Sequence, residues 1–419
     1  ISMPITSGAL VIGGGISGMT AALNLAEQGF EVNLVEREEE LGGNLRHLYY
    51  LLGGDEPQKE LGETIQKVNS HPKIKVWTGA EIDEIEGFIG NFKTKIKRNG
   101  TEAEVEHGAV IVATGAKPHT PTEYMYGSDE KVITQLDLEE KLAKGEFDAK
   151  RVVMIQCVGS REEDRMYCSR VCCSQAIKNA IKIKEDYPDT DIFILYREVR
   201  TYGFREKYYT EARKKGVRFV RYEVEQKPTV FANNGRLRIE VEDLILGNVL
   251  QIDADYLVLA PAIVPQNDVE DIAQMLKVPF TKDRFFLEAH MKLRPVDFSV
   301  EGVFLAGMAH APKNIEEAIA QAKAAASRAS TILSKTEYVP EAIIASVDED
   351  VCAACGICVS ICSFDAPEIV TVRGRKYSQI NTALCKGCGA CATACPSGAM
   401  QQFGFKAKQI TDMISAALE

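Results

Sequence analysis

The segment from residue 9 to residue 36 constrains the fold of this chain more strongly than any other. An apolar run (ALVIGG), a glycine-rich turn, a helix-like run (SGMTAALNLAEQG) and a second apolar run (EVNLVE) follow one another in that order. A strand, a G-x-G-x-x-G turn, a helix and a strand in this order are typical of a βαβ unit that binds a dinucleotide at the helix N-terminus. A glycine-rich turn with no ligand is the alternative.

Physical requirements of dinucleotide binding explain the residue types found at key positions of this unit. Gly13 and Gly15 allow the backbone to approach a pyrophosphate, and Gly18 allows the helix to pack closely. Glu36, at the end of the second apolar run, can accept a hydrogen bond from a ribose hydroxyl. The neighbouring residues that we predict to line the same site are Ile16, Ser17 and Arg37.

One further segment favours FAD over NAD as the dinucleotide, and another is placed where it could contact the flavin part of that ligand. The apolar run at 107–118 closes on an Ala-Thr-Gly triplet, which resembles the return crossover of flavoproteins with two dinucleotide folds. A second glycine turn follows the first unit and is placed to meet the flavin-side phosphate or the ribityl chain, although on its own it is more typical of a surface turn. The residues concerned are Ala113, Thr114, Gly115, Gly42, Gly43 and Asn44.

The chain is predicted to return to this first unit near residues 302–330. The flavin-closing motif usually has Gly-Asp after a strand, whereas this chain has Gly307 followed by Met308. The alanine-rich helix that begins near Ile315 can direct its N-terminal dipole at the flavin N1/C2 edge and stabilise a reduced, anionic flavin. An ordinary packing helix is the alternative.

A second α/β unit is predicted from residue 150, where the apolar run RVVMIQCVGS begins. A nicotinamide-binding domain would have another glycine fingerprint after this strand, but the turn here is Cys157-Val158-Gly159-Ser160-Arg161. This departure argues against NAD(P)H binding at that place.

Four of the twelve cysteines lie in this second unit: Cys157, Cys168, Cys172 and Cys173. The last two fall near the start of a predicted helix, and Cys168 and Cys172 are spaced to share a helical face. A helix N-terminus suits an anionic cluster. We interpret the four as ligands of a [4Fe–4S] cluster beside the flavin, with a redox-active dithiol or inert core cysteines as the alternatives.

The other eight cysteines form two C-x2-C-x2-C-x3-C runs near the C-terminus. This is the signature of bacterial two-cluster ferredoxins, in which the fourth cysteine of each run ligates the other cluster. A zinc site is the alternative. The pattern assigns one [4Fe–4S] cluster to Cys352, Cys355, Cys358 and Cys395. It assigns a second to Cys385, Cys388, Cys391 and Cys362, so that three [4Fe–4S] clusters are predicted in all.

Composition excludes several classes of protein. The formal net charge is −11 with no block of Lys or Arg, which gives nucleic acid little to bind. No apolar run approaches the roughly 20 residues needed to cross a bilayer, and no leader pattern precedes the first strand. Cysteines at metal-ligand spacings predict cluster ligation in a reducing cytoplasm rather than disulfides.

These patterns together predict an α/β fold with two dinucleotide-binding, thioredoxin-reductase-like domains and a C-terminal bacterial two-[4Fe–4S] ferredoxin domain. The FAD domain is expected to be discontinuous, and a hinge-like linker is expected before the second domain. The predicted bounds are 1–118 with 293–340 for the FAD domain, 119–149 for the linker, 150–292 for the second domain, 341–405 for the ferredoxin domain and 406–419 for a helical docking tail.

Nearly the whole chain resembles the HdrA-like family of heterodisulfide reductase subunits. The stretches that carry the resemblance include GGGISGMTAALNLAEQGFEVNLVE, AVIVATGA and GVFLAGMAHAPKNIEEAIAQA, and the most specific are QCVGSR and YCSRVCC. The resemblance implies FAD and an unusual [4Fe–4S] cluster held by the four mid-chain cysteines. It also implies that Lys178, five residues after the Cys-Cys pair, lies close to flavin N5 as the catalytic residue, with a solvated helical lysine as the alternative.

The function implied is that of an oxidoreductase component in a cytoplasmic complex of the HdrABC type. Electrons would pass between flavin, mid-chain cluster and ferredoxin-type clusters, and onward to other subunits, a ferredoxin, or a hydrogenase or dehydrogenase module. Electron bifurcation is a further property of the family. The printed sequence does not contain the N-terminal extension and inserted ferredoxin of the large methanogen-type member, so the full electron circuit of that member is not expected from these residues alone. An NAD(P)H-dependent flavin–iron–sulfur reductase and a non-catalytic electron relay are the alternatives.

Overall fold

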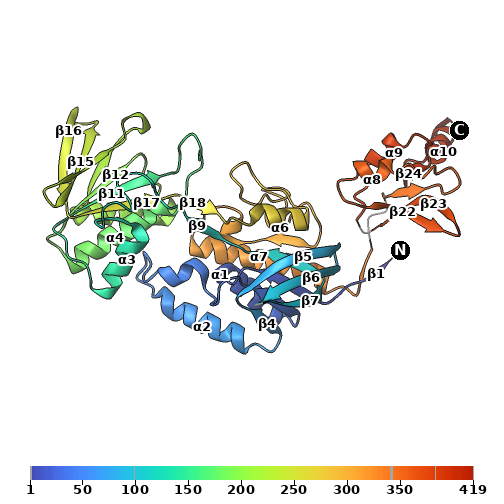
Figure 1. The fold of residues 1–419 in the computed structure, drawn as a ribbon, viewed down its shortest axis with the longest axis horizontal. Helices are drawn as coiled ribbons and strands as arrows, with labels where there is room; N and C mark the ends of the chain where they lie inside the picture. Colours follow the sequence, from blue (N-terminus) through green and yellow to red (C-terminus); the bar gives the residue numbers. More distant parts are fainter. Residues whose placement is uncertain (1, 99, 340–342, 383, 419) are drawn as a thin grey trace.

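The computed structural model describes residues 2–98, 100–339, 343–382 and 384–418. Figure 1 shows three parts along the long axis of the molecule. A domain with α3 and α4 lies at one end, a domain with α1 and α7 lies in the centre, and a small domain with α8 and α9 lies at the other end.

The central domain is built on a five-stranded parallel sheet in the order β19-β8-β2-β3-β4. Its strands are β2 (Gly8–Ile12), β3 (Glu31–Val35), β4 (Ile74–Trp77), β8 (Ala109–Val112) and β19 (Val303–Leu305). One face is covered by α1 (Ile16–Glu27), α2 (Pro57–Ser70) and α7 (Ile315–Leu333), which share one buried apolar cluster with the sheet. Small alanine side chains such as Ala22 and Ala326 let α1 and α7 approach closely. The predicted βαβ unit is confirmed, because α1 connects β2 to the parallel strand β3.

The other face of this sheet carries a three-stranded antiparallel sheet and one helix. The strands are β5 (Ala80–Phe88), β6 (Asn91–Arg98) and β7 (Thr101–His107), and the helix is α6 (Val269–Leu276). The alternation of apolar and polar residues over 74–106 predicts an antiparallel insert throughout, but Ile74–Trp77 is instead the edge strand of the parallel sheet. Alternation of apolar and polar residues is compatible with a strand of an antiparallel insert and with an edge strand of a parallel sheet, because both are only partly buried.

The second domain has a parallel sheet in the order β10-β17-β11-β12-β13. Its strands are β10 (Val132–Thr134), β11 (Arg151–Val158), β12 (Asp191–Tyr196), β13 (Arg218–Arg221) and β17 (Tyr256–Pro261). Its helices are α3 (Gln135–Lys144), α4 (Cys172–Asp186) and α5 (Glu206–Lys214). An antiparallel sheet of β14 (Thr229–Asn233), β15 (Arg236–Asp243) and β16 (Asn248–Ala254) completes it, and η3 (Val224–Gln226) precedes β14.

Two of the expected boundaries differ from the observed structure. Residues 132–144, predicted within the linker 119–149, form β10 and α3, and β10 pairs with β17 inside the second sheet. Val269–Leu276, predicted within the second domain, packs in the core of the central domain. The antiparallel pairing of β9 (Ala116–Pro118) with β18 (Ile263–Pro265) also connects the central and second domains.

The small C-terminal domain contains two short antiparallel sheets of two strands each, β21 with β24 and β22 with β23, and two one-turn helices. Its elements are β21 (Ala345–Val347), α8 (Ile357–Ile361), β22 (Pro367–Val372), β23 (Arg375–Ile380), α9 (Ala390–Ala394) and β24 (Met400–Gln402). The predicted boundary between residues 340 and 341 lies outside the described residues. Near it, β1 (Met3–Pro4) pairs with β20 (Glu337–Tyr338).

The tail forms α10 (Ala407–Leu418), as predicted, but none of its described residues is buried. Its apolar side chains, among them Met413 and Ile414, are exposed. The tail therefore does not pack on the described remainder of this chain. Separately, no helix among the described residues is both long enough and apolar enough to span a membrane.

Candidate functional site

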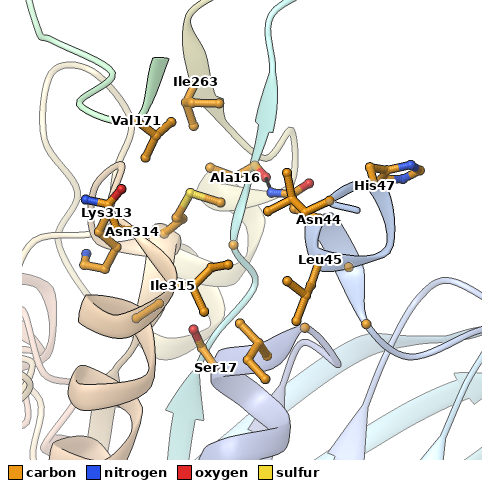
Figure 2. A pocket seen from close by; sticks show the side chains of 18 of the residues that line it. Ser17, Asn44, Leu45, His47, Ala116, Val171, Ile263, Lys313, Asn314 and Ile315 are labelled. Carbon is orange, nitrogen blue, oxygen red and sulfur yellow. Dashed lines mark hydrogen bonds between the residues drawn. The ribbon is translucent and has the colours of Figure 1, made fainter. Parts of the chain in front are cut away.

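A cavity of about 1720 Å³ lies between the central and second domains. Figure 2 shows side chains from α1, from the short helix η1 (Gly43–His47), from the start of α7 and from the loop before α4 converging on it. Most of the predicted FAD residues line this cavity. They are Gly13, Gly15, Ile16, Ser17, Glu36, Arg37, Gly42, Gly43, Asn44, Ala113, Thr114, Gly115, Met308 and Ile315.

The two remaining predicted FAD residues, Gly18 and Gly307, lie behind the cavity wall. A Cβ atom on Gly18 would stand 1.7 Å from the carbonyl oxygen of Gly13, and one on Gly307 would stand 2.3 Å from the Ser17 hydroxyl oxygen. Gly307 opens η4 (Gly307–Ala309) with a φ of +69°. Both glycines therefore shape the wall by close packing.

Gly15 differs from these two because a Cβ atom there would meet no protein atom within 4 Å. Its φ of −71° is ordinary for any residue. Neither the backbone conformation nor internal packing requires a glycine at position 15. The remaining reason for a glycine here is that it keeps the space in front of the turn open. Close approach of a ligand phosphate is the use that this space has in dinucleotide-binding turns.

Glu36 closes the glycine turn from the end of β3. Its carboxylate accepts hydrogen bonds from the backbone N–H groups of Gly14 (2.5 Å) and Glu38 (2.9 Å), and the residue is 9% exposed. A carboxylate has about four acceptor positions, so capacity remains for a ribose hydroxyl. Thr114 Oγ1 and Asn314 Nδ2, both buried on cavity-lining residues, have no hydrogen-bond partner within the described structure. These atoms fit a polar ligand such as FAD.

The start of α7 places a cation beside the cavity that no sequence pattern reveals. The Lys313 ammonium donates to the carbonyl oxygens of Gly307 (2.8 Å) and Ala311 (3.1 Å), and the side chain is buried. Burial, with the nearby Arg170 charge, lowers the pKa of Lys313 to about 8. In sequence, a lysine just before a helix looks the same as a surface residue.

Lys178 lines the second-domain side of the same cavity and is 8% exposed, which excludes a solvated helical lysine. Its ammonium donates to Glu139 Oε2 (2.7 Å) and to the carbonyl oxygen of Tyr50 (2.8 Å). Glu139 itself is fully buried and also accepts from the backbone N–H of Tyr49 at 2.8 Å. Burial lowers the pKa of Lys178, and the Glu139 carboxylate opposes that effect.

The structure brings the four mid-chain cysteines together. The hydrogen bond between Cys172 and Cys173 raises the pKa of Cys172 and lowers that of Cys173 to about 7. Burial raises the pKa of the Cys157 thiol to about 11, and the neighbouring Cys173 and Cys168 act in the same direction. Cys172 also lines the large cavity.

The backbone around these cysteines is unusual. Cys157, Arg161 and Arg170 all have a backbone φ near +60°, which residues other than glycine rarely adopt. Such conformations cluster at functional sites, where surrounding contacts hold them. Positive charge surrounds the thiols, since Arg161, Arg200 and Arg197 all act on their pKa values. An anionic cluster fits this environment.

In the C-terminal domain, the structure brings together the four cysteines that the spacing assigns to the first cluster. Cys352, Cys355, Cys358 and Cys395 line one small cavity, to which the second run contributes the fourth member. Backbone N–H groups point at the sulfurs, from Ser378 to Cys352 (3.4 Å) and from Met400 to Cys395 (3.4 Å). Such bonds to sulfur are among the features that tune iron–sulfur clusters.

For the second set, burial raises the pKa of Cys391 to about 11, with Cys385, Cys362 and Cys388 as the next contributors. These are the four cysteines assigned to the second cluster. The backbone N–H of Ala345 donates to Cys385 Sγ at 3.3 Å. Among the described residues, no three Cys, His, Asp or Glu side chains converge tightly enough for a single metal ion. A four-iron cluster holds its ligands further apart than one ion does.

Comparisons with known families agree with this arrangement. Residues 8–159 match the family described as pyridine nucleotide-disulphide oxidoreductase, and residues 333–399 match the 4Fe-4S dicluster domain. Among solved structures, a thioredoxin reductase from Lactococcus lactis matches with a TM-score of 0.55 at 15% identity, covering 78% of this chain and 99% of the other. One from T. acidophilum matches with a TM-score of 0.53 at 18% identity, covering 78% of this chain and 96% of the other. The predicted fold class is therefore confirmed.

The fold and the site define a flavin- and iron–sulfur-containing oxidoreductase. The HdrA-type component of the H(2):CoB-CoM heterodisulfide,ferredoxin reductase of Methanothermobacter marburgensis is 36% identical over 98% of this chain and 76% of its own length. The corresponding iron-sulfur component of the CoB–CoM heterodisulfide reductase of Methanocaldococcus jannaschii is 34% identical over 98% of this chain and 77% of its own length. The chain belongs to the HdrA-like family of heterodisulfide reductase subunits.

Proposed function

We propose that this chain is the FAD- and [4Fe–4S]-containing subunit of a multi-subunit complex, in which electrons pass between flavin, the mid-chain cluster and the ferredoxin-type clusters. The observation that carries this proposal is one continuous cavity. Its lining runs from Gly13 and Gly15 in the glycine turn to Cys172 and Lys178 in the second domain. A flavin that extends along it would lie beside the cysteine quartet.

Each part of the cavity has a distinct role in the proposal. Gly13, Gly15 and Glu36 would hold the ADP portion of FAD, and Gly18 would keep α1 close behind them. FAD, when bound, supplies the conversion between two-electron and one-electron chemistry. The N-terminus of α7 directs partial positive charge at the cavity. Lys178 would donate a hydrogen bond at flavin N5, and Glu139 holds the ammonium in place.

Three [4Fe–4S] clusters are proposed, one on the mid-chain quartet and two on the C-terminal domain. The C-terminal pair would connect the chain to its partners. Curated relatives are named as subunits of CoB-CoM heterodisulfide reductases, and some names also include ferredoxin. We propose partner subunits of the HdrABC type, with a ferredoxin or a hydrogenase or dehydrogenase module as electron partner, and electron bifurcation at the flavin. The exposed apolar face of α10 supports docking to a further protein of the complex.

A cytoplasmic location is part of the proposal. The twelve cysteines stand at the spacings of cluster ligands, and cysteines used in this way rather than in disulfides are typical of a reducing compartment. Nucleic acid is not proposed as a partner, because the net charge is −11.

Replacement of Cys157, Cys168, Cys172 and Cys173 with serine, one at a time, tests the mid-chain cluster. Each variant, purified without oxygen, should lose the four irons of one [4Fe–4S] cluster and retain FAD and the C-terminal clusters. Iron and flavin analysis on the same sample is the measurement. An unchanged iron content in any one variant would remove that cysteine from the ligand set, and unchanged iron in all four would refute the cluster.

An NAD(P)H-dependent reductase is the second candidate. The match of residues 8–159 to the pyridine nucleotide-disulphide oxidoreductase family favours it. It predicts that NADH or NADPH alone bleaches the flavin absorbance rapidly, whereas our first proposal requires partner subunits for reduction. Stopped-flow absorbance at the flavin band separates the two.

A further inference from the structure

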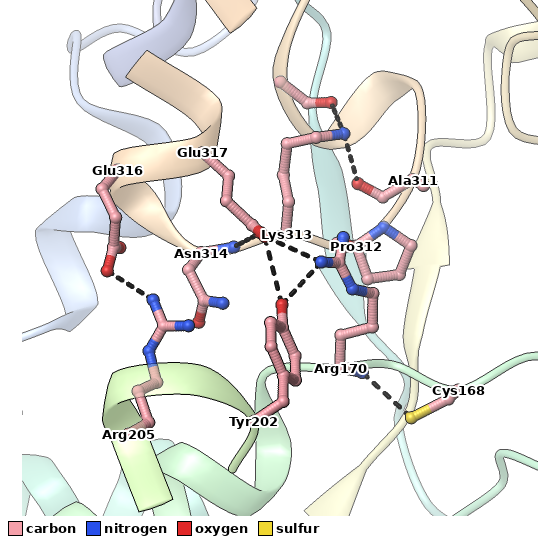
Figure 3. A network of polar contacts seen from close by, with 11 residues as sticks. Cys168, Arg170, Tyr202, Arg205, Ala311, Pro312, Lys313, Asn314, Glu316 and Glu317 are labelled. Carbon is pink, nitrogen blue, oxygen red and sulfur yellow. Dashed lines mark hydrogen bonds and ion pairs between the residues drawn. The ribbon is translucent and has the colours of Figure 1, made fainter. Parts of the chain in front are cut away.

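Arg170 connects the mid-chain cysteines directly to the central domain. Its backbone N–H donates to Cys168 Sγ at 3.3 Å, which ties it to the cysteine loop. Its guanidinium extends the other way and donates to the carbonyl oxygen of Pro312 (3.1 Å) and to Glu317 (2.8 Å). Figure 3 shows this single side chain spanning from the cysteine loop to the first turn of α7.

Glu317 is the acceptor at the central-domain end of this connection. Its carboxylate accepts from Arg170 (2.8 Å), from the Tyr202 hydroxyl (3.1 Å) and from the backbone N–H of Asn314 (3.0 Å). Arg170 and Tyr202 belong to the second domain, whereas Asn314 belongs to the central domain. One carboxylate at a helix N-terminus, where the dipole favours negative charge, therefore joins both domains.

The Tyr202 ring packs at the same junction. Its hydroxyl accepts from the Arg170 guanidinium at 2.6 Å, and the guanidinium carbon lies 5.6 Å from the ring centroid. A planar guanidinium with five donors can serve Pro312, Tyr202 and Glu317 at once, which a lysine ammonium cannot do with the same geometry. The φ of Arg170, +59°, shows that the backbone accepts an unfavourable conformation at this point.

We propose that Arg170 is a positioning residue that fixes the mid-chain cysteine loop against the N-terminus of α7 and thereby sets the rate of electron transfer between flavin and mid-chain cluster. The inference rests on the proposed function. In the step concerned, the reduced flavin loses one electron and the oxidised cluster gains it, with no bond made or broken in the cluster. The cluster would then pass this electron to the ferredoxin-type clusters of the proposed function, which would leave it oxidised and able to accept the second flavin electron in the same way.

The test uses the full-length holoprotein and the variants R170A, R170K and E317Q. Reduced methyl viologen, generated by a radiolysis pulse, delivers one electron at a time, and absorbance then follows transfer between flavin and cluster within the molecule. We expect R170A to slow this transfer by about tenfold, the scale on which lost charge-assisted hydrogen bonds weaken docking of the loop. R170K and E317Q, which each keep part of the network, should fall between R170A and wild type.

The matched control is R205A. Arg205, from the short helix η2 (Gly203–Arg205), forms an ion pair with Glu316 across the same domain junction, and its guanidinium carbon lies 5.9 Å from the centroid of the Tyr202 ring. No described hydrogen bond joins Arg205 to the cysteine loop, so R205A disturbs the junction without releasing that loop. We expect R205A to transfer electrons at the wild-type rate. Equal slowing in R205A would mean that general loosening of the junction is responsible, and it would overturn the role of Arg170.

Iron and FAD analysis of each protein precedes the kinetics. A wild-type protein without FAD or without mid-chain iron would refute the proposed function, independently of Arg170. If R170A loses iron, E317Q decides, because Glu317 lies outside the cysteine loop. Wild-type transfer rates in R170A with full iron and FAD, or in E317Q when R170A cannot be loaded, would refute the inference.

Discussion

Among single residues, the buried pair of Lys178 and Glu139 has the largest consequence for both stability and site chemistry. The two charges are 8% and 0% exposed and lie 2.7 Å apart. Removal of one partner from such a pair leaves an uncompensated buried charge. Lys178 therefore cannot be explained by its proposed contact with flavin alone, since it also neutralises Glu139.

We expect Lys178→Ala to lower the free energy of unfolding of the second domain by about 3 kcal/mol or more. Anaerobic denaturant unfolding, followed by circular dichroism, measures this change. Lys182→Ala is the control, because Lys182 lies on the same helix and pairs with Asp186 at 3.0 Å in a half-exposed setting. The control should cost less than about 1 kcal/mol. Equal costs in both variants would contradict the buried pair.

Gly15 and Gly18 separate ligand binding from internal packing within one turn. Gly15→Ala adds a Cβ atom to open space, so the protein should fold normally. If the pyrophosphate of FAD occupies that space, FAD affinity should fall by about tenfold or more, the scale of overpacking a tight contact. Fluorescence titration of flavin-depleted protein with FAD provides the measurement.

Gly18→Ala should instead disturb folding of the glycine turn itself. Its Cβ atom would stand 1.7 Å from the carbonyl oxygen of Gly13 and would force α1 away from the turn. Gly62→Ala in α2 meets no atom within 4 Å and serves as the neutral control for both. Wild-type FAD affinity in Gly15→Ala would contradict the placement of the dinucleotide.

At the scale of secondary-structure elements, the corner between β7 and β8 gives a pH-dependent prediction. His107 is fully buried, with Nε2 2.7 Å from Thr94 Oγ1 and Nδ1 3.1 Å from the carbonyl oxygen of Ala109. Burial lowers its pKa from 6.5 to about 4. Between these values the unfolded chain binds the proton and the folded chain does not, so stability rises with pH across this window.

Acidification from pH 6.5 towards pH 4 should therefore remove up to about 3 kcal/mol of stability through His107. His107→Gln should weaken this dependence, and thermal unfolding of both proteins at several pH values in this range tests it. Parallel pH profiles for wild type and variant would show that His107 makes no such contribution.

The elements that could be predicted from the sequence are those whose pattern is local. The unit from Gly8 to Val35 follows from glycine spacing and hydrophobic runs, and it forms as expected. Three-residue β10 has too few residues to show a period, so its segment resembles a linker. Ile74–Trp77 alternates as an antiparallel strand would, and only its pairing with β3 reveals the parallel sheet.

At the scale of the whole molecule, the site depends on pairings between distant segments that no local pattern encodes. Cysteine spacing predicts which residues come together in the C-terminal domain, because ligand geometry fixes that spacing. The partner of Lys178 could not be predicted, since Glu139 is 39 positions away in a helix-like segment that the sequence assigns to the linker between the domains. The Arg170–Glu317 contact joins residues 147 positions apart for the same reason.

One flavin and three [4Fe–4S] clusters per chain is the proposal on which the assigned roles of the cavity and the cysteines depend. Quantification of FAD and iron in protein purified without oxygen tests it. We predict one FAD and twelve irons per chain, with four irons lost when any ligating cysteine of the mid-chain quartet is replaced. Absent flavin absorbance together with iron well below twelve per chain would contradict it.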